Sequence, residues 1–202
     1  MSFRTRLTSF FILIVVVPMI AVGFLVFRLI SDSEQGKADA RANGLLTAAA
    51  SVYRNESTTA SADAQTIARA LGSFTSAAPA LATVRARVAT LAAQSGLARV
   101  TVSAGSTMLA NIGDPTAVAP GLATVGTGAR QLTVTVSEIT AAQYARQLAA
   151  PGVAIVVRDG ARTLASTLQP ALGARPLALH GTVSVGGTTY RAVSDLSLIH
   201  IS

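Results

Sequence analysis

Four side chains in the second half of this sequence have the chemistry to bind a small carboxylate. Tyrosine hydroxyls donate and accept hydrogen bonds, and the planar arginine guanidinium fits a carboxylate through two parallel hydrogen bonds. We predict a small-ligand pocket between sheet and helices. Its candidate residues are Tyr144, Tyr190, Arg191 and Arg130. The alternative is that Tyr144 only packs on the sheet and the arginines are solvated. Successive strand residues face opposite sides, so at most one of Tyr190 and Arg191 can enter the pocket.

The sequence contains no recognisable catalytic set or metal site. Its only histidines are His180 and His200, and it has no cysteine. Disulfides and thiolate metal sites are therefore excluded, and a lone histidine among scattered carboxylates does not supply the ligands that a metal needs. We expect this chain to have no enzyme activity, no metal and no cofactor.

The net charge does not indicate a nucleic-acid partner. The formal charge is +7, but the basic residues are scattered singly and aromatic residues make up only 4% of the chain. A nucleic-acid surface would combine a basic groove with aromatic platforms for the bases. We therefore expect no nucleic-acid binding.

The elements that would position such a site follow an apolar stretch near the N-terminus. Residues Leu7 to Phe27 carry no charge, and Arg4 and Arg6 precede them. A bilayer core about 30 Å thick needs roughly 20 apolar residues in a helix. Pro18 and other breakers are tolerated in such helices. The sequence predicts a transmembrane helix over residues 7–30.

The charges around this stretch predict its orientation. Arg4 and Arg6 place residues 1–6 in the cytoplasm by the positive-inside rule, so everything after Ile30 should be extracytoplasmic. A cleaved secretory signal is the alternative. Its apolar core usually spans about 7–15 residues and ends at a small-x-small site. Residues Phe24 to Ile30 offer no such site, so we favour an uncleaved anchor in the cell membrane.

Residues 31–72 read as a long amphipathic helix that leaves the membrane and can continue the anchor. Apolar residues recur at three-and-four spacing, as at Leu45, Ala49 and Val52, and Gly72 is a plausible end. One interpretation is a core helix of the domain, and the other is a stalk that pairs with a second copy. Both can hold, and we expect a homodimer through this helix.

Residues 73–195 should form one α+β domain. We expect a turn at 76–79, a helix over Leu81–Ser95 and a loop over Thr116–Gly128, and Thr140 is the candidate N-cap of a short helix over 140–149. Period-two alternation and turn residues predict strands at 98–103, 107–112, 130–137, 153–157 (a buried strand), 161–168, 178–185 and 188–194. Sequential hairpins imply one antiparallel sheet with helices on one face.

This arrangement resembles the extracytoplasmic Cache-type, PAS-like sensor domains of bacterial receptors. The likeness is carried by Val153–Leu168, an apolar strand followed by an Asp-Gly turn and a strand ending in Ala-Ser-Thr, and by the closing hairpin Val183–Ser194. It implies that the chain senses a stimulus outside the cell and relays it inward. It implies a small-molecule ligand but does not identify that ligand.

The opening residues 1–30 resemble the start of membrane-bound diguanylate cyclases (GGDEF proteins) of actinobacteria. Histidine kinases and chemoreceptors are the near alternatives. The resemblance implies that a second membrane helix, a HAMP relay and a cytoplasmic output domain follow in the full protein. The alternative function is a membrane-anchored structural or adhesive module without an output domain.

The last seven residues differ in composition from the rest. Leu196–Ser202, LSLIHIS, resembles the translation of a DNA sequencing adapter. We expect this tail to be artefactual and the sequence to be truncated before its output domain.

Overall fold

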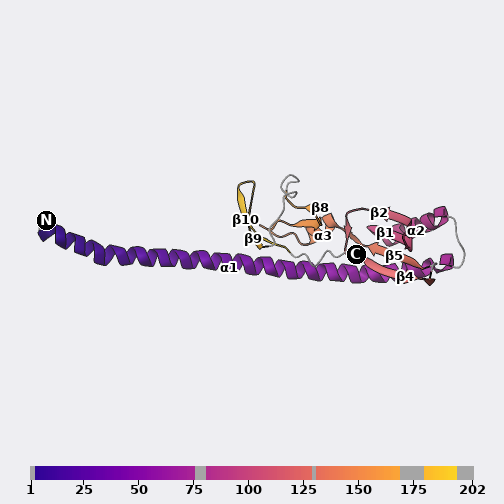
Figure 1. The fold of residues 1–202 in the computed structure, drawn as a ribbon, viewed down its shortest axis with the longest axis horizontal. Coiled ribbons are helices and arrows are strands. Elements are labelled where there is room, and N and C mark those ends of the chain that lie inside the picture. The colour runs from indigo at the N-terminus through magenta and orange to yellow at the C-terminus, as the bar shows by residue number, and fades with distance from the viewer. Residues whose placement is uncertain (1–2, 76–80, 129–130, 169–179, 195–202) are drawn as a thin grey trace. The chain divides into compact units, whose positions relative to one another are not determined.

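The computed structural model describes residues 3–75, 81–128, 131–168 and 180–194, and combines helices with antiparallel strands (Figure 1). The helical elements are α1 (Phe3–Ala70), a 3₁₀ turn η1 (Gly72–Thr75), α2 (Leu81–Ser95) and α3 (Ala141–Gln147). The strands are β1 (Arg99–Ala104), β2 (Thr107–Gly113), β3 (Ala117–Val118), β4 (Gly121–Val125), β5 (Leu132–Ser137), β6 (Ile139–Thr140), β7 (Val156–Asp159), β8 (Arg162–Ser166), β9 (His180–Val185) and β10 (Thr188–Val193). The chain divides into two compact units, Met1–Gly44 and Leu45–Ser202.

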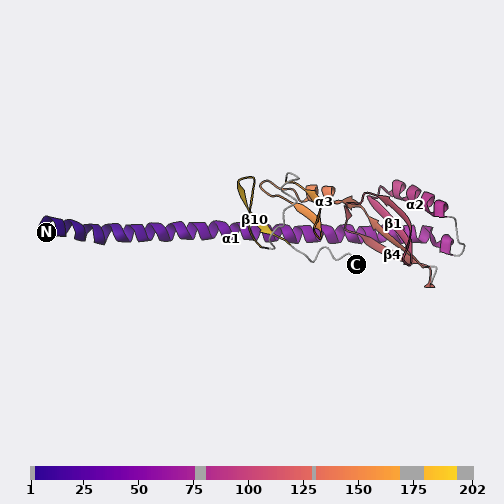
Figure 2. The same ribbon diagram turned by 45° about the horizontal axis from the view of Figure 1, so that its top comes forward.

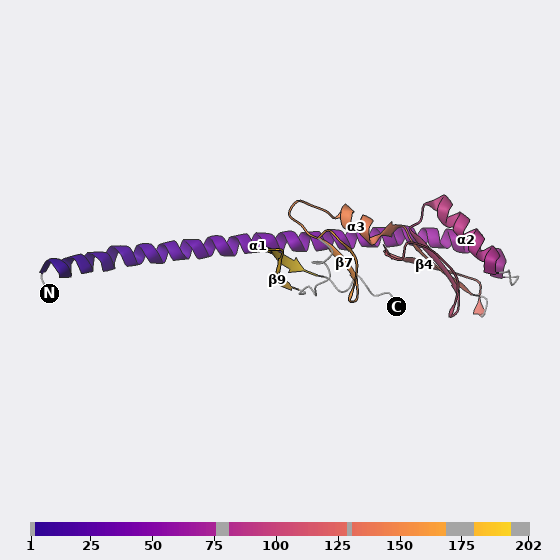
Figure 3. The ribbon, with the colours of Figure 1, turned by 90° about the horizontal axis from the view of Figure 1, so that it is seen from above.

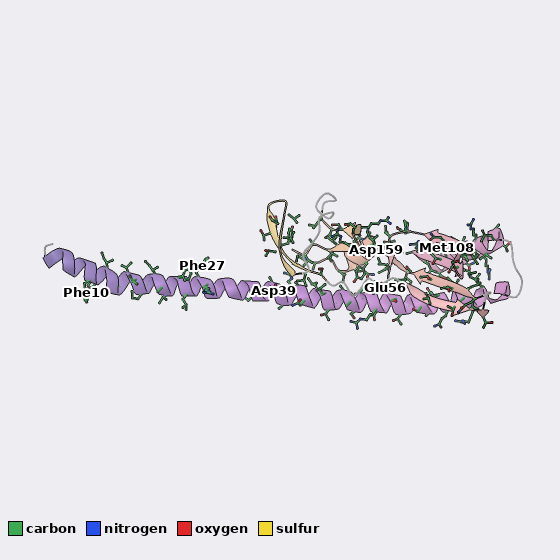
Figure 4. All side chains as sticks on the ribbon, viewed as in Figure 1. Phe10, Phe27, Asp39, Glu56, Met108 and Asp159 are labelled. Carbon is green, nitrogen blue, oxygen red and sulfur yellow. The ribbon has the colours of Figure 1, made fainter. Side chains whose placement is uncertain are left out.

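The first unit contains an apolar helical segment that is long enough to cross a membrane. This segment is Phe10–Arg28, 19 residues of α1. Its side chains project from the helix, as labelled for Phe10 and Phe27 in Figure 4, and these two are 64% and 72% exposed. Pro18 lies inside α1 without ending it. The predicted apolar helix is confirmed.

The second unit is built on a four-stranded antiparallel sheet with the order β2-β1-β5-β4. The predicted hairpin of residues 98–112 is confirmed as β1 and β2, with Val100 opposite Ile112. Strand β5 pairs with the other edge of β1 and places Val134 opposite Val102. Period-two alternation therefore turns the valines of β1 and β5 to one common face.

The valine face packs on two helices (Figure 2). Helix α2 is confirmed at its predicted bounds and buries Val84 and Val88. Helix α1 contributes residues at three-and-four spacing. The core cluster consists of Ala60, Ala64, Ile67, Ala68, Leu71, Val84, Val88, Ala92, Val100, Val102, Ala110, Ala123, Leu132, Val134 and Val136. Part of the predicted stalk, residues 31–72, is thus a core helix of the domain.

The predicted loop over Thr116–Gly128 is wrong, because it contains β3 and β4. Strand β4 buries Gly121 and Ala123 and exposes Leu122, which is 60% exposed. Its core-facing residues are small because they lie against α1, so the strand lacks the usual pattern of large apolar residues facing inward. The glycine and proline residues around it therefore suggested a loop.

The single predicted sheet is also wrong. Hairpins β7–β8 and β9–β10 are two-stranded sheets of their own, drawn as separate ribbons in Figure 3, and β3 pairs with β6 in a third. Strand β8 packs on α3. Its residues Leu164 and Ala165 contact a second apolar cluster, which consists of Val118, Ile139, Ala141 and Tyr144. The prediction of a buried strand at 153–157 is wrong in its start and its burial, because β7 begins only at Val156 and is half-buried. Residues 76–79, Arg130, the loop before β9 and the tail 196–202 lie outside the described residues.

Candidate functional site

The candidate site is the face by which the C-terminal part of α1 packs into the second unit. We call it the docking face. Its residues recur every three or four positions, as expected for one side of a helix. They are Ala49, Val52, Tyr53, Ser57, Ala60, Ser61, Ala64, Ile67, Ala68 and Leu71. All of them belong to the unit that also contains the sheet.

Helix α3 brings Tyr144 onto the docking face. Its start is set by a capping box, in which the Thr140 hydroxyl accepts a hydrogen bond from the Gln143 main-chain N–H and the Gln143 side chain accepts one from the Thr140 N–H. The predicted N-cap is therefore confirmed. Tyr144 is 7% exposed, and its hydroxyl donates a hydrogen bond of 2.8 Å to the Ala49 carbonyl oxygen.

Tyr144 also contacts an aromatic residue of α1. The rings of Tyr53 and Tyr144 meet edge to face, with centroids 6.3 Å apart and planes at 84°. This geometry is favourable for aromatic pairs. Burial, and secondarily Tyr53, raises the pKa of Tyr144 to about 12. The hydroxyl therefore keeps its proton at neutral pH and remains a donor to Ala49.

The segment before β4 lies directly on the backbone of α1. The Ser57 hydroxyl donates a hydrogen bond of 2.8 Å to the Pro120 carbonyl oxygen. A Cβ atom added at Gly121 would overlap the main-chain atoms of Ala60 and Ser61. Ala119 has a positive φ of 52°, which is uncommon for a residue with a side chain. Glycine at position 121 is thus required by the close approach of two backbones.

Glu138 is an acidic residue whose pKa is affected by residues of α1. It lies between β5 and β6, and its neighbours Ser137 and Ile139 are buried. Its Oε1 atom is inaccessible to solvent and has no hydrogen-bond partner. Burial raises the pKa of Glu138, and the charges of Asp63 and Glu56 on α1 raise it further.

The four predicted ligand residues are not brought together. Tyr144 contacts Ala49 and Tyr53, whereas Tyr190 is half-buried in β10 opposite Val183. Among the described residues, no hydrogen bond or ring contact joins the two tyrosines. The Arg191 backbone pairs with Thr182, and nothing is described of its side chain. With Arg130 outside the described residues, the carboxylate pocket stays a prediction.

Sequence reasoning missed Tyr53, Ser57 and Glu138. The signal for the first two was available, because both follow Ala49 at intervals of four and so share its side of the helix. Glu138 gives no local signal. Among the described residues no group of three or more His, Asp or Glu side chains is arranged to hold a metal ion.

Comparison of the chain with protein-family models, curated proteins and solved structures finds no match. The function must therefore be inferred from the docking face. This face can fix α1 against the sheet, and a change in the packing or the charge of the sheet would act directly on α1.

Proposed function

We propose that this chain is the membrane-tethered, extracytoplasmic sensor region of a transmembrane signalling receptor. One observation carries the proposal. A single helix, α1 from Phe3 to Ala70, contains both the apolar segment Phe10–Arg28 and the docking face. The continuous helix gives a direct covalent connection from the docking face to the apolar segment.

In this proposal the docking face transmits the stimulus from the domain to α1. Closely packed cores switch between discrete arrangements instead of deforming continuously. The backbone contact at Gly121 and the hydrogen bonds from Ser57 and Tyr144 leave little room for gradual adjustment. A ligand or another stimulus would shift α1 only to the extent that it favours one arrangement over the other.

The partner in this mechanism would be a second copy of the chain, paired through α1. The side of α1 opposite the docking face is exposed and carries small or polar residues, as at Ser51, Asn55 and Ala62. The hydroxyls of Thr58, Thr59 and Thr66 bond to carbonyl oxygens of their own helix, which leaves their methyl groups to contact a neighbour. This face could therefore accept a second helix at close range.

The family and the output follow only from resemblance. The sheet with its long first helix is compatible with a Cache-type, PAS-like sensor domain, and the opening residues resemble those of diguanylate cyclases. The output domain would then be a diguanylate cyclase or, as the nearest alternative, a histidine kinase. The ligand would be a small molecule, with either Tyr190 or Arg191 as a candidate contact.

Topology reporters test the proposal. Alkaline phosphatase fused after Ser194 should be active, because it folds only outside the cytoplasm, and green fluorescent protein fused before Met1 should fluoresce. The control is Arg4→Glu with Arg6→Glu, which should weaken or invert this orientation.

An inactive phosphatase at Ser194 together with a fluorescent reporter there would overturn the topology. Recovery of a soluble chain that has lost about its first thirty residues would overturn the tether, since that length corresponds to the predicted anchor. Gel mass and membrane fractionation of the same fusions decide between these outcomes.

A further inference from the structure

Glu138 is placed unusually for an acidic side chain. Its Oε1 atom has neither solvent nor a hydrogen-bond partner, and the residues on either side of it are buried. Glu138 as a whole is half-buried. The ionised form nevertheless loses the hydration of this one oxygen without a compensating hydrogen bond, which costs the protonated form less. The contact is therefore more favourable when the carboxyl carries a proton.

Two acidic residues of α1 beside the docking face make this preference stronger. Glu56, labelled on α1 in Figure 4, and Asp63 are seven residues apart and so lie on one side of the helix, two turns from each other. Both act on the Glu138 carboxyl. Ionisation of Glu138 places a third negative charge next to these two, which disfavours the docked arrangement.

The charges that raise the pKa of Glu138 are negative. On α1 the basic residue nearest in sequence to Glu56 is Arg54, which is exposed and donates a hydrogen bond to the Ala50 carbonyl oxygen. Strands β3, β4 and β5 carry no ionisable residue. Helix α3 carries Tyr144, whose hydroxyl is bonded to Ala49, and the exposed Arg146. The charged groups that raise the pKa of Glu138 are Asp63 and Glu56.

We propose that Glu138 makes the docking face a proton sensor: α1 is held against the sheet while this carboxyl is protonated, and the contact loosens when the carboxyl ionises. The inference rests on the proposed function, because it assigns extracytoplasmic pH as a stimulus of that same site. When the contact loosens, the Val118–Gly121 segment and β6 should separate from α1 first, because they lie next to Glu138 and the docking face.

The direction of the response follows from linkage. An unperturbed glutamate has a pKa of 4.5, and that of Glu138 is raised in the folded chain. The folded state therefore binds the proton more tightly. The contribution of Glu138 to docking is fully present below about pH 4.5 and is lost as the pH rises through its raised pKa.

The first test is a direct titration. Glu34, Glu56 and Glu138 are the only glutamates in the sequence, so ¹³C-glutamate labelling of the full chain in detergent micelles yields three side-chain carboxyl signals. Single Glu→Gln variants assign them. The Glu138 signal should titrate with a midpoint above 4.5. A midpoint at or below that value overturns the proposal.

The second test measures docking itself. Hydrogen exchange of residues 117–121 and 139–141, corrected for the intrinsic effect of pH, should show a loss of protection as the pH rises through the Glu138 midpoint. Glu138→Gln should abolish this loss, and Asp63→Asn should reduce it. The matched control is Asp159→Asn, an exposed carboxyl in the β7–β8 hairpin, which should leave it unchanged.

A pH-dependent loss that persists in Glu138→Gln would overturn the proposal. If that variant does not fold, the wild-type titration still decides. Neither test depends on which side of the membrane the domain occupies, so the topology reporters can fail while these measurements succeed, and the reverse.

Discussion

The hydroxyl of Tyr144 donates a hydrogen bond to the carbonyl oxygen of Ala49, a residue 95 positions earlier in the chain. The bond joins α3 to the long helix α1, and the ring that carries it packs edge to face on Tyr53. One side chain thus combines a polar and an aromatic contact with α1. Removing the hydroxyl alone, or the whole side chain, should separate the contribution of the hydrogen bond from that of the aromatic contact.

Substitution of Tyr144 by phenylalanine should lower the free energy of unfolding by about 1 kcal/mol, because only the hydrogen bond is lost. Tyr144→Ala should lower it by about 3–5 kcal/mol, the usual effect of deleting a buried aromatic side chain. Denaturant unfolding in micelles, followed by circular dichroism, measures both. Tyr190→Phe is the control, since its hydroxyl bonds to none of the residues that the structure describes. Equal effects of Tyr144→Phe and Tyr190→Phe would contradict the assigned bond.

Alkaline pH should weaken the same contact. The pKa of Tyr144 is raised from 10.0 to about 12, chiefly by burial, so the folded chain binds this proton more tightly than the unfolded chain. Its contribution to stability is present in full below pH 10 and is lost as the pH rises through about 12. The melting temperature of wild type should therefore fall more steeply than that of Tyr144→Phe above pH 10. Parallel curves would show that Tyr144 ionises as it does in the unfolded chain.

Gly121→Ala and Gly44→Ala should have opposite effects although the substitution is the same. At Gly121 the new methyl group would overlap the backbone of α1, and at Gly44 it meets nothing within 4 Å. Overpacking costs about 1–3 kcal/mol and occasionally more, and this overlap involves main-chain atoms that cannot rotate away. Replacing an unconstrained helical glycine by alanine stabilises by about 0.5–1 kcal/mol. Unfolding curves of the two variants check this pair, and destabilisation by Gly44→Ala would contradict it.

Pairing of two copies through α1 should appear in a cysteine scan, since the sequence has no native cysteine. Ser51→Cys, Asn55→Cys and Ala62→Cys lie on the exposed side of α1 and should form disulfide-linked dimers in membranes under mild oxidation. Ala60→Cys and Ala64→Cys are buried on the docking face and serve as controls that should stay monomeric. Dimers on a non-reducing gel provide the measurement. Equal cross-linking on both sides, or none, would contradict dimerisation through this face.

Local signals predicted much of the fold because the interactions that form it are close in sequence. The alternation in Ala98–Ile112 indicated the β1–β2 hairpin, and Thr140 indicated the start of α3 through hydrogen bonds to a residue three positions away. Strand β4 escaped prediction because its inward residues, Gly121 and Ala123, are small. Their size suits the approach of α1, which lies some sixty positions earlier.

By itself the sequence determined that an uncharged apolar helix opens the chain and that helices and short antiparallel strands follow, because apolar periodicity and turn residues act within a few positions. Only the tertiary structure decided that α1 contributes one side to the domain core, that the Tyr144 hydroxyl bonds to Ala49, and that one oxygen of the Glu138 carboxyl is buried near two acidic residues. These contacts join segments separated by sixty to a hundred residues, and their partners are selected by shape and by exclusion of water, neither of which a linear pattern records.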